Sequence, residues 1–173
     1  MKKLSVIPLL LALCLALNSC FMILSTPIDP TLVSPEDLGT KKTFVKAGIT
    51  LQLTEKFKEE ESERGFDAYY TSPFCGVTVT KELFTSREGL TEQSPEEYMR
   101  DFLKSIGQTD IEPQNRDGLW FYVKYNDSSA RCVYSYVYKG TDAFYIVQYI
   151  LNTSDEAILK DTLHNWAKAT LVA

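Results

Sequence analysis

Apolar and polar residues alternate regularly where the chain first becomes typical of a folded domain. Ile49, Leu51 and Leu53 are each followed by a polar residue, and this period of two predicts a strand with one buried face. Two further segments, residues 66–71 and 74–84, are rich in strand-forming residues and are joined by a Ser-Pro pair. The first half of the domain is therefore expected to contain three strands.

A helix signal follows these strands. Ser94 can act as the N-cap, a proline suits the first helical position, and Glu97 can reach back to complete a capping box. Apolar residues then recur every four positions, beginning with Tyr98 and Phe102, and Gly107 is suited to end the helix. The pattern predicts an amphipathic helix that packs one face on the sheet.

Three more strands are expected in quick succession, over residues 119–125, 131–138 and 143–151. The segments between them contain Asn, Asp, Ser and Gly, which favour tight turns and therefore antiparallel hairpins. The last of the three strands is apolar at both even and odd positions. Such a strand is expected to be covered on both faces of the sheet.

A final helix is expected to begin at a capping box in residues 153–156 and to end near residue 170. Its apolar face consists of Ile158, Leu159, Leu163, Trp166 and Thr170. Trp166 is the largest of these side chains, so we expect it to anchor the helix in the core.

The order of the elements is three strands, a helix, three strands and a helix. This order is typical of the α+β class, in which helices pack on an antiparallel sheet. We therefore expect an antiparallel β-sheet of about six strands flanked by helices. The predicted domain spans residues 43–173, with no internal repeat.

Several local segments, in this order, resemble the PsbP-like family, which is named after an extrinsic subunit of photosystem II. The matching strands, helix start and hairpin lie at residues 48–53, 77–82, 94–98 and 139–145. The late helix with its tryptophan also fits. The resemblance covers about residues 43–173 and implies an α/β/α sandwich with interaction or assembly roles and no shared catalytic motif. It implies no photosynthetic role, because a fold does not specify a function.

The N-terminal segment resembles the signal of bacterial lipoproteins. Lys2 and Lys3 precede a mostly apolar stretch over residues 4–17, which is too short to cross a bilayer as a stable helix. The stretch ends in Leu17-Asn18-Ser19-Cys20, which resembles a lipobox. We expect residues 1–19 to be a signal peptide and Cys20 to carry the lipid anchor, including fatty acyl chains such as palmitate. A cleaved signal without lipidation is the alternative.

Residues 20–42 are predicted to form a lipidated tether between this anchor and the domain. Three prolines interrupt any periodicity there, at Pro27, Pro30 and Pro35, and polar residues keep the segment solvated. Two or more acyl chains hold a protein stably on a membrane. The sequence therefore predicts a lipid-anchored protein on the extracytoplasmic face of a cell membrane or outer membrane.

The charge balance excludes some classes of partner. The chain has 18 basic and 23 acidic side chains, and the predicted signal contains two of the basic ones, so the mature chain carries a net charge near −7. Proteins that bind nucleic acid need clustered Lys and Arg to neutralise phosphates, so this acidic balance argues against nucleic acid as a partner. An acidic surface also disfavours electrostatic docking on anionic lipid. Membrane attachment is therefore assigned to the acyl chains alone.

Two cysteines remain once the signal is removed and Cys20 is lipidated. They are Cys75 and Cys132, both in apolar, strand-like surroundings. The predicted compartment permits disulfides, so a bridge between them is one interpretation. The other is that each packs as a small apolar side chain.

Residues able to perform chemistry are sparse. His164 is the one histidine, and its helical position groups it with Lys160 and Lys168, away from the apolar face. A solvent-facing imidazole is therefore expected, not the buried one of a Ser-His-Asp hydrolase. No Cys/His cluster has zinc-ligand spacing, and the acidic run at residues 59–61 matches no calcium loop. We expect no metal, no cofactor and no enzymatic activity.

Aromatic residues are concentrated on the predicted strands. The candidate binding residues are Tyr69, Tyr70, Trp120, Tyr122, Tyr134, Tyr136 and Tyr138. The last three alternate along one strand and so share a face. Two interpretations stay open: a ladder packed beneath a helix, or an exposed aromatic platform for a protein partner or an apolar ligand.

The sequence thus favours a non-catalytic, membrane-anchored lipoprotein that acts as a protein-interaction or assembly module of the cell envelope. Its expected partners are the membrane, through the lipid anchor, and an envelope protein. The alternative is a lipoprotein that binds a small apolar ligand in a pocket between sheet and helix. A pocket lined by Trp120 and several tyrosines would favour this alternative, and a flat exposed aromatic patch would favour the interaction module.

Overall fold

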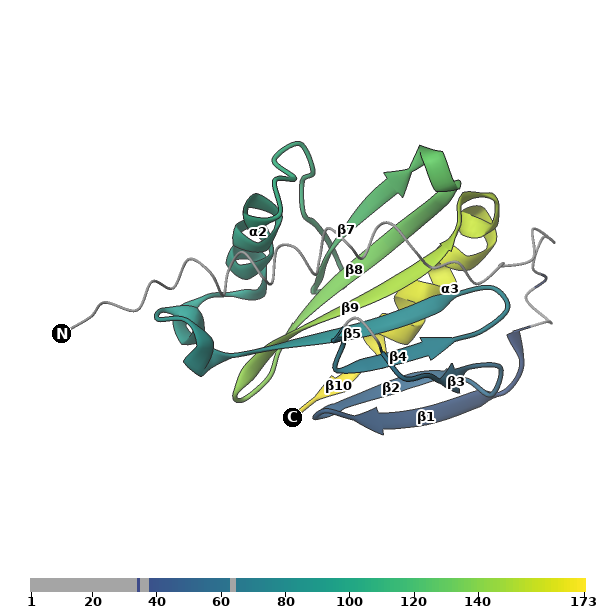
Figure 1. The fold of residues 1–173 in the computed structure, drawn as a ribbon, viewed down its shortest axis with the longest axis horizontal. Coiled ribbons are helices and arrows are strands. Elements are labelled where there is room, and N and C mark those ends of the chain that lie inside the picture. The colour runs from purple at the N-terminus through teal and green to yellow at the C-terminus, as the bar shows by residue number, and fades with distance from the viewer. Residues whose placement is uncertain (1–33, 35–37, 63–64) are drawn as a thin grey trace.

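The computed structural model describes residues 34, 38–62 and 65–173 (Figure 1). The predicted signal peptide, Cys20 and most of the predicted tether lie outside the described residues. Within them, the chain forms two antiparallel β-sheets, of seven and three strands, and two α-helices. The α+β class predicted from the order of elements is confirmed.

The large sheet joins the two halves of the chain. Its strand order is β3-β4-β5-β9-β8-β7-β6. The strands span β3 (Lys58–Glu59), β4 (Ala68–Thr71), β5 (Gly76–Leu83), β6 (Gln114–Arg116), β7 (Leu119–Asn126), β8 (Arg131–Lys139) and β9 (Ala143–Asn152). Strand β9 is the link, because it pairs with β5 on one side and β8 on the other, with Val79 and Tyr136 both opposite Val147.

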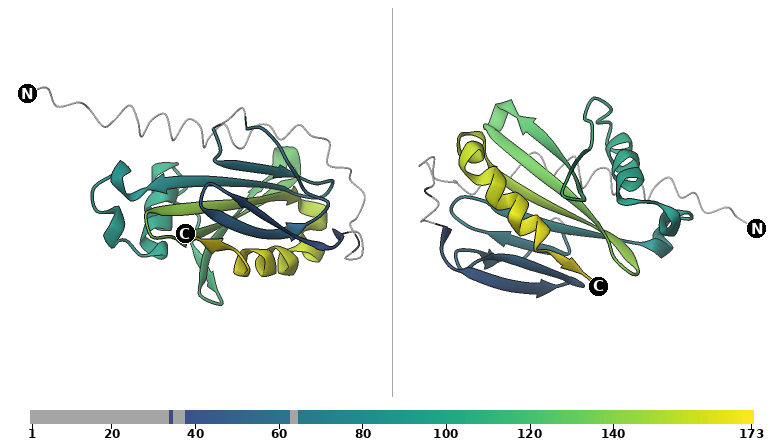
Figure 2. Two further views of the ribbon diagram at one scale, coloured as in Figure 1. Left: turned by 90° about the horizontal axis from the view of Figure 1, so that it is seen from below. Right: turned by 180° about the vertical axis from the view of Figure 1, so that it is seen from behind.

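The two helices cover opposite faces of this sheet, as Figure 2 also shows. Helix α2 (Pro95–Ser105) packs in a cluster with Phe144 and Ile146 of β9. Helix α3 (Glu156–Lys168) packs in the cluster that contains Tyr145 and Val147. Alternate residues of a strand point to opposite faces, so β9 is covered on both. All residues of β9 but the last are buried, which confirms the prediction made from its apolar pattern.

The small sheet was not predicted. It consists of β1 (Lys41–Lys46), β2 (Ile49–Thr54) and β10 (Leu171–Val172), in the order β1-β2-β10. The prediction of about six strands in one sheet was therefore incomplete. Strands β3, β6 and β10 are two or three residues long, and β1 is lysine-rich and largely exposed, so none of these four shows the alternation that identifies a strand.

The folded part of the chain begins before the predicted boundary at residue 43. Strand β1 starts at Lys41, within the segment assigned to the tether. Leu38 is only 9% exposed and belongs to the hydrophobic core. The backbone N–H of Glu55 donates to the carbonyl of Thr40 at 2.9 Å. Residues 38–42 therefore contribute contacts to the domain.

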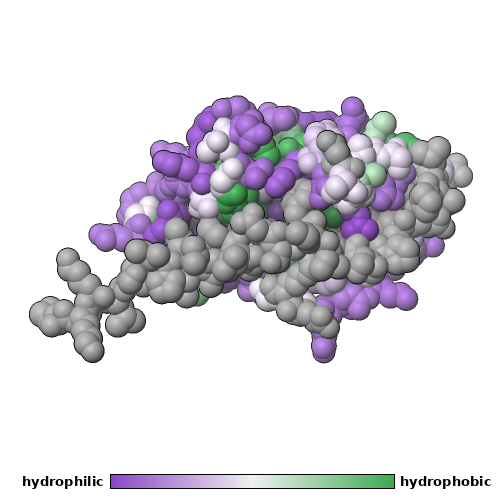
Figure 3. Space-filling view, turned by 45° about the horizontal axis from the view of Figure 1, so that its top comes forward, coloured by the Kyte–Doolittle hydropathy of each residue, from purple (hydrophilic) through white to green (hydrophobic). Residues whose placement is uncertain are grey.

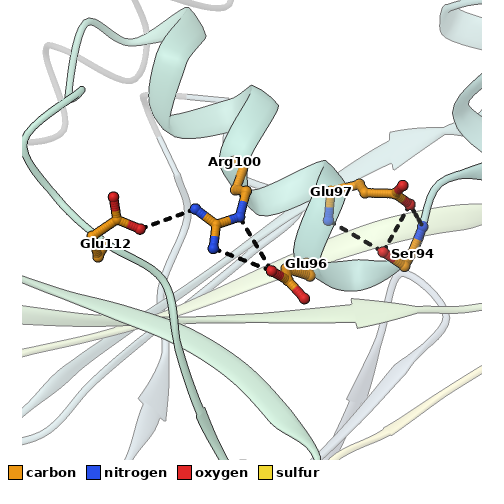
Figure 4. A network of polar contacts seen from close by, with 5 residues as sticks. All are labelled: Ser94, Glu96, Glu97, Arg100 and Glu112. Atoms are coloured by element: carbon orange, nitrogen blue, oxygen red, sulfur yellow. Dashed lines mark hydrogen bonds and ion pairs between the residues drawn. The ribbon is translucent and has the colours of Figure 1, made fainter.

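The start of α2 forms as the sequence predicts (Figure 4). Ser94 Oγ accepts from the Glu97 N–H at 3.2 Å, and Glu97 accepts from the Ser94 N–H at 2.8 Å. The pKa of Glu97 is lowered, chiefly by the hydrogen bond from the Ser94 backbone. On the next turn of α2, Arg100 pairs with Glu96 at 3.1 Å and with Glu112 at 2.9 Å. The pair with Glu112 connects α2 to the segment that follows it, and the pair with Glu96 lies within the helix.

The start of α3 differs from the prediction. Residues Thr153–Asp155 form a 3-10 turn, and no side chain caps the helix that follows. Asp155, at the cap position, has helical backbone angles rather than the extended ones of a side-chain cap. The capping box expected at residues 153–156 is therefore absent. The apolar face of the helix is confirmed, since Leu159, Leu163 and Trp166 are all buried.

Candidate functional site

The tyrosine ladder on β8 packs beneath helix α3. Tyr134, Tyr136 and Tyr138 are 7%, 1% and 7% exposed. The Tyr138 hydroxyl donates to the carbonyl of Ala167 at 2.8 Å, and the Tyr134 hydroxyl donates to Glu156 at 2.5 Å. The ladder therefore fixes the helix to the sheet, which is the packed alternative left open by the sequence.

The seven candidate aromatic residues do not form one exposed platform. Tyr70 and Tyr122 are also buried, in the two different clusters on opposite faces of the large sheet. Tyr69 and Trp120 are half-buried. On the face drawn in Figure 3, hydrophobic residues occupy only small separate areas among polar ones. Of the two interpretations left open by the sequence, the exposed aromatic platform is therefore wrong, because both faces of the sheet are covered by other elements.

His164 is buried, contrary to the expectation of a solvent-facing imidazole. It is 2% exposed, with Nδ1 3.5 Å from the Tyr136 hydroxyl and Nε2 3.5 Å from Asp117 Oδ2. Asp117 lies in the turn between β6 and β7, where its φ is 54°. The helical pattern alone could not reveal this burial, because the cover comes from β8 and from a turn about 45 residues earlier in the chain.

The His164 cluster does not provide a nucleophile. Burial raises the pKa of Tyr136, the hydroxyl nearest the imidazole, so the phenol stays neutral and is inaccessible at 1% exposure. The pKa of Asp117 is lowered, chiefly by the Lys168 ammonium at 3.2 Å and then by His164. A hydrolase needs an imidazole beside a nucleophile that substrate can reach. The contacts are those of a structural link between the β6–β7 turn and α3.

Cys75 and Cys132 are free thiols, both fully buried. Cys132 lies opposite Leu151, and Gly76 lies opposite Ile150, so strand β9 separates the two cysteines. Across one intervening strand the separation is about 10 Å, whereas bridged cysteines have Cα atoms within about 7 Å. The disulfide considered from the sequence is therefore absent. Burial raises the pKa of Cys75, and that of Cys132 to about 12.

The candidate functional site is a groove between the small sheet and helix α3. Its volume is about 590 Å³, and it is lined by Lys41, Gln52, Thr162, Asn165, Trp166 and Ala169. The three residues of α3 and Ala169 at its C-cap are spaced i, i+3, i+4 and i+7, which places them on one side of the helix. Gln52 belongs to the face of β2 opposite that of Leu51 and Leu53, which are fully buried. The groove is thus formed by a helix stripe and the outer face of the small sheet.

The groove has a mainly apolar surface, to which Trp166 contributes, with polar side chains around it. Trp166 is 6% exposed and packs edge-on against Phe57, with ring centroids 5.5 Å apart. Among the described residues, the structure shows no side-chain partner for Lys41, Thr162 or Asn165. These ammonium, hydroxyl and amide groups are therefore available to a ligand, and none of them is a nucleophile paired with a base.

Sequence reasoning identified only Trp166 among the six lining residues, and assigned it to the core. The others come from two regions that are far apart in the sequence, the β1–β2 hairpin and the end of the chain around α3. A stripe of small or polar residues beside the apolar face of the last helix, at positions 162, 165 and 169, was the signal that could have indicated the helix wall. The sheet wall could not be found, since β1 was not predicted.

The described part of the chain has neither a membrane-spanning helix nor a metal-binding cluster. None of its helices is long and apolar enough to cross a membrane. It also contains no group of three or more His, Cys, Asp or Glu residues that could hold a metal ion.

Comparison with known proteins supports the fold. No protein-family model matches the chain, and no curated protein matches it. Among solved structures, it is similar to the solution structure of cyanobacterial PsbP (CyanoP) from Synechocystis sp. PCC 6803. The TM-score is 0.56 at 11% sequence identity, over 83% of this chain and 99% of that one. At this identity the similarity shows the fold alone, and it agrees with the PsbP-like resemblance of the sequence.

Proposed function

We propose that the protein is a non-catalytic, membrane-anchored lipoprotein that acts as a protein-interaction or assembly module of the cell envelope. The observation that carries the proposal is the groove between the small sheet and α3. It presents hydrogen-bonding side chains that have no partner among the described residues. It contains no nucleophile beside a base, so its chemistry favours recognition over catalysis.

The proposed anchor is Cys20, through the lipobox-like Leu17-Asn18-Ser19-Cys20. Seventeen residues lie between Cys20 and Leu38, where the described core begins. Chain geometry limits that segment to a span of roughly 60 Å. A lipidated Cys20 would therefore keep the groove within reach of other proteins on the same membrane, where its effective concentration is high.

A capture experiment with a matched pair of variants tests this function. The membrane that carries the intact lipoprotein is solubilised, and the lipoprotein is recovered together with the proteins bound to it. The procedure is carried out on the wild type and on the variants Ala169→Arg and Ala157→Arg. Both alanines are exposed, Ala157 on α3 and Ala169 at its C-cap, but only Ala169 lines the groove. A specific partner should be lost with Ala169→Arg and kept with Ala157→Arg. A partner set that is identical in all three proteins would refute a groove-based interaction.

The second candidate function is that of a small-ligand-binding lipoprotein. The groove volume of about 590 Å³ falls within the roughly 300–1,000 Å³ of small-molecule sites. It lies between sheet and helix, as that alternative requires, although Trp166 lines it instead of Trp120. Native mass spectrometry would support this function if the purified protein carried a small molecule that Ala169→Arg lacked. A protein that carries no such molecule would leave the interaction module favoured.

A further inference from the structure

We infer that the groove recognises an extended acidic segment of the partner protein, with a carboxylate at Lys41 and an apolar side chain over Val45 and Leu171. This inference rests on the proposed function and specifies the chemistry of its partner. It follows from the charge of the groove, from the register of the small sheet and from the spacing of two features on one face.

The charge of the groove is opposite to that of the whole chain. The chain carries a net charge of −5, yet among the described residues the charged side chain that lines the groove is that of Lys41, and none of the lining residues described is acidic. The structure shows no ion pair for Lys41 among the described residues, whereas Lys46 on the same strand pairs with Glu59. An ammonium with no acidic partner among the described residues, on the wall of this groove, favours an anionic ligand.

The middle of the groove suits a peptide backbone. Asn165 presents an amide, which both donates and accepts hydrogen bonds and so matches the N–H and C=O of an extended chain. Gln52 faces it from the sheet and already accepts from the Thr43 hydroxyl at 3.1 Å, which leaves its amide N–H groups as donors. Thr162 adds a hydroxyl on the helix wall.

The apolar end of the site is set by the register of the small sheet. Val45 lies opposite Thr50, and Leu171 lies opposite the same Thr50 from the other side. Val45 and Leu171 do not line the groove itself, and they are 73% and 65% exposed. Because alternate residues of a strand share a face, Val45 lies on the same face as Lys41. An apolar side chain of the partner would cover this pair.

The spacing of the two ends predicts a motif. Lys41 and Val45 are four residues apart on β1, which is about 13 Å along a strand. A partner segment in extended conformation would span that distance with an acidic residue and an apolar residue four positions apart. This geometry commits the groove to one kind of occupant, a strand-like peptide of the Glu-x-x-x-Leu type.

The test is binding of a fluorescent peptide, Glu-Thr-Thr-Thr-Leu with blocked ends, to the full purified chain by fluorescence polarisation. Two control peptides replace Glu by Gln, or place Leu next to Glu. The proteins are the wild type, Lys41→Glu, and Lys160→Glu as the matched charge control. Lys160 is exposed on α3 but does not line the groove. Circular dichroism confirms that each variant is folded.

We expect the acidic peptide to bind the wild type at least about fivefold more tightly than either control peptide, the scale of one exposed ion pair. Lys41→Glu should remove this preference and Lys160→Glu should retain it. Equal binding of the three peptides, or equal effects of the two variants, would overturn the inference. If the capture experiment still showed a groove-dependent partner, the proposed function would stand and only the acidic chemistry would be rejected. If the peptide preference and the groove-dependent partner were both absent, the proposed function would be rejected as well.

Discussion

Substitution of Trp166 tests how helix α3 is held to the domain, and with it one wall of the groove. The side chain is 6% exposed and contacts the rings of Phe57, Phe74 and Tyr149, at centroid distances of 5.5, 6.5 and 6.3 Å. Truncation of a buried tryptophan to alanine costs about 3–5 kcal/mol. Aromatic pairs add about 0.5–1.5 kcal/mol each beyond the area they bury. We therefore expect Trp166→Ala to fall in the upper half of this range.

This loss of unfolding free energy in Trp166→Ala is large, because domains of this size are stable by only about 5–15 kcal/mol. Urea unfolding followed by far-ultraviolet circular dichroism measures it, and an unchanged denaturant slope would show that the unfolded state is unaltered. Trp120→Ala is the control, since Trp120 is half-buried and packs against the other cluster, and it should cost less. A loss below about 1.5 kcal/mol for Trp166→Ala would refute the assignment of this residue as the anchor of α3.

Three further predictions concern the anchor, the boundary of the domain and a hydrogen-bonded tyrosine. Cys20→Ser should abolish labelling by a fatty-acid analogue and move the protein out of a detergent phase; unchanged partitioning would contradict lipidation. A chain that begins at Leu38 should keep full stability, whereas one that begins at Thr43 should lose about 2–3 kcal/mol in urea unfolding, from the buried Leu38 and the first pairs of β1. Equal stability would show that residues 38–42 do not contribute. The hydrogen bond to Glu156 raises the pKa of Tyr125 from 10.0 to about 12, so the unfolded chain releases this proton at lower pH than the folded one. Stability should therefore be complete below pH 10 and fall as the pH rises through 12, which a series of melting temperatures checks; Glu156→Gln should weaken the dependence.

Much of the fold could be predicted because its signals are local. The capping box of α2 involves residues three positions apart, and the double burial of β9 follows from its own apolar run. The apolar face of α3 likewise follows from its helical period. Each of these features is determined by residues that are close together in the sequence, so the sequence pattern is sufficient to predict it.

The features that could not be predicted depend on contacts between distant segments. His164 follows Leu163 on the helix, but its burial depends on Tyr136 and on the turn that holds Asp117. Strand β10 is two residues long and exists through its pairing with β2. The groove combines β1, β2 and α3, so no local pattern could reveal it. The functional site of this chain is therefore a property of its tertiary structure.

Site-specific photo-cross-linking in intact cells tests the central claim most directly. A photoreactive amino acid replaces Thr162, which lines the groove, or Ala157, which is exposed elsewhere on α3. Irradiation should link position 162 to one membrane or envelope protein, and position 157 should give no such product. The product at position 162 should also disappear when Cys20→Ser releases the protein from the membrane. Equal products from both positions, or none from position 162, would contradict a membrane-anchored module that acts through this groove.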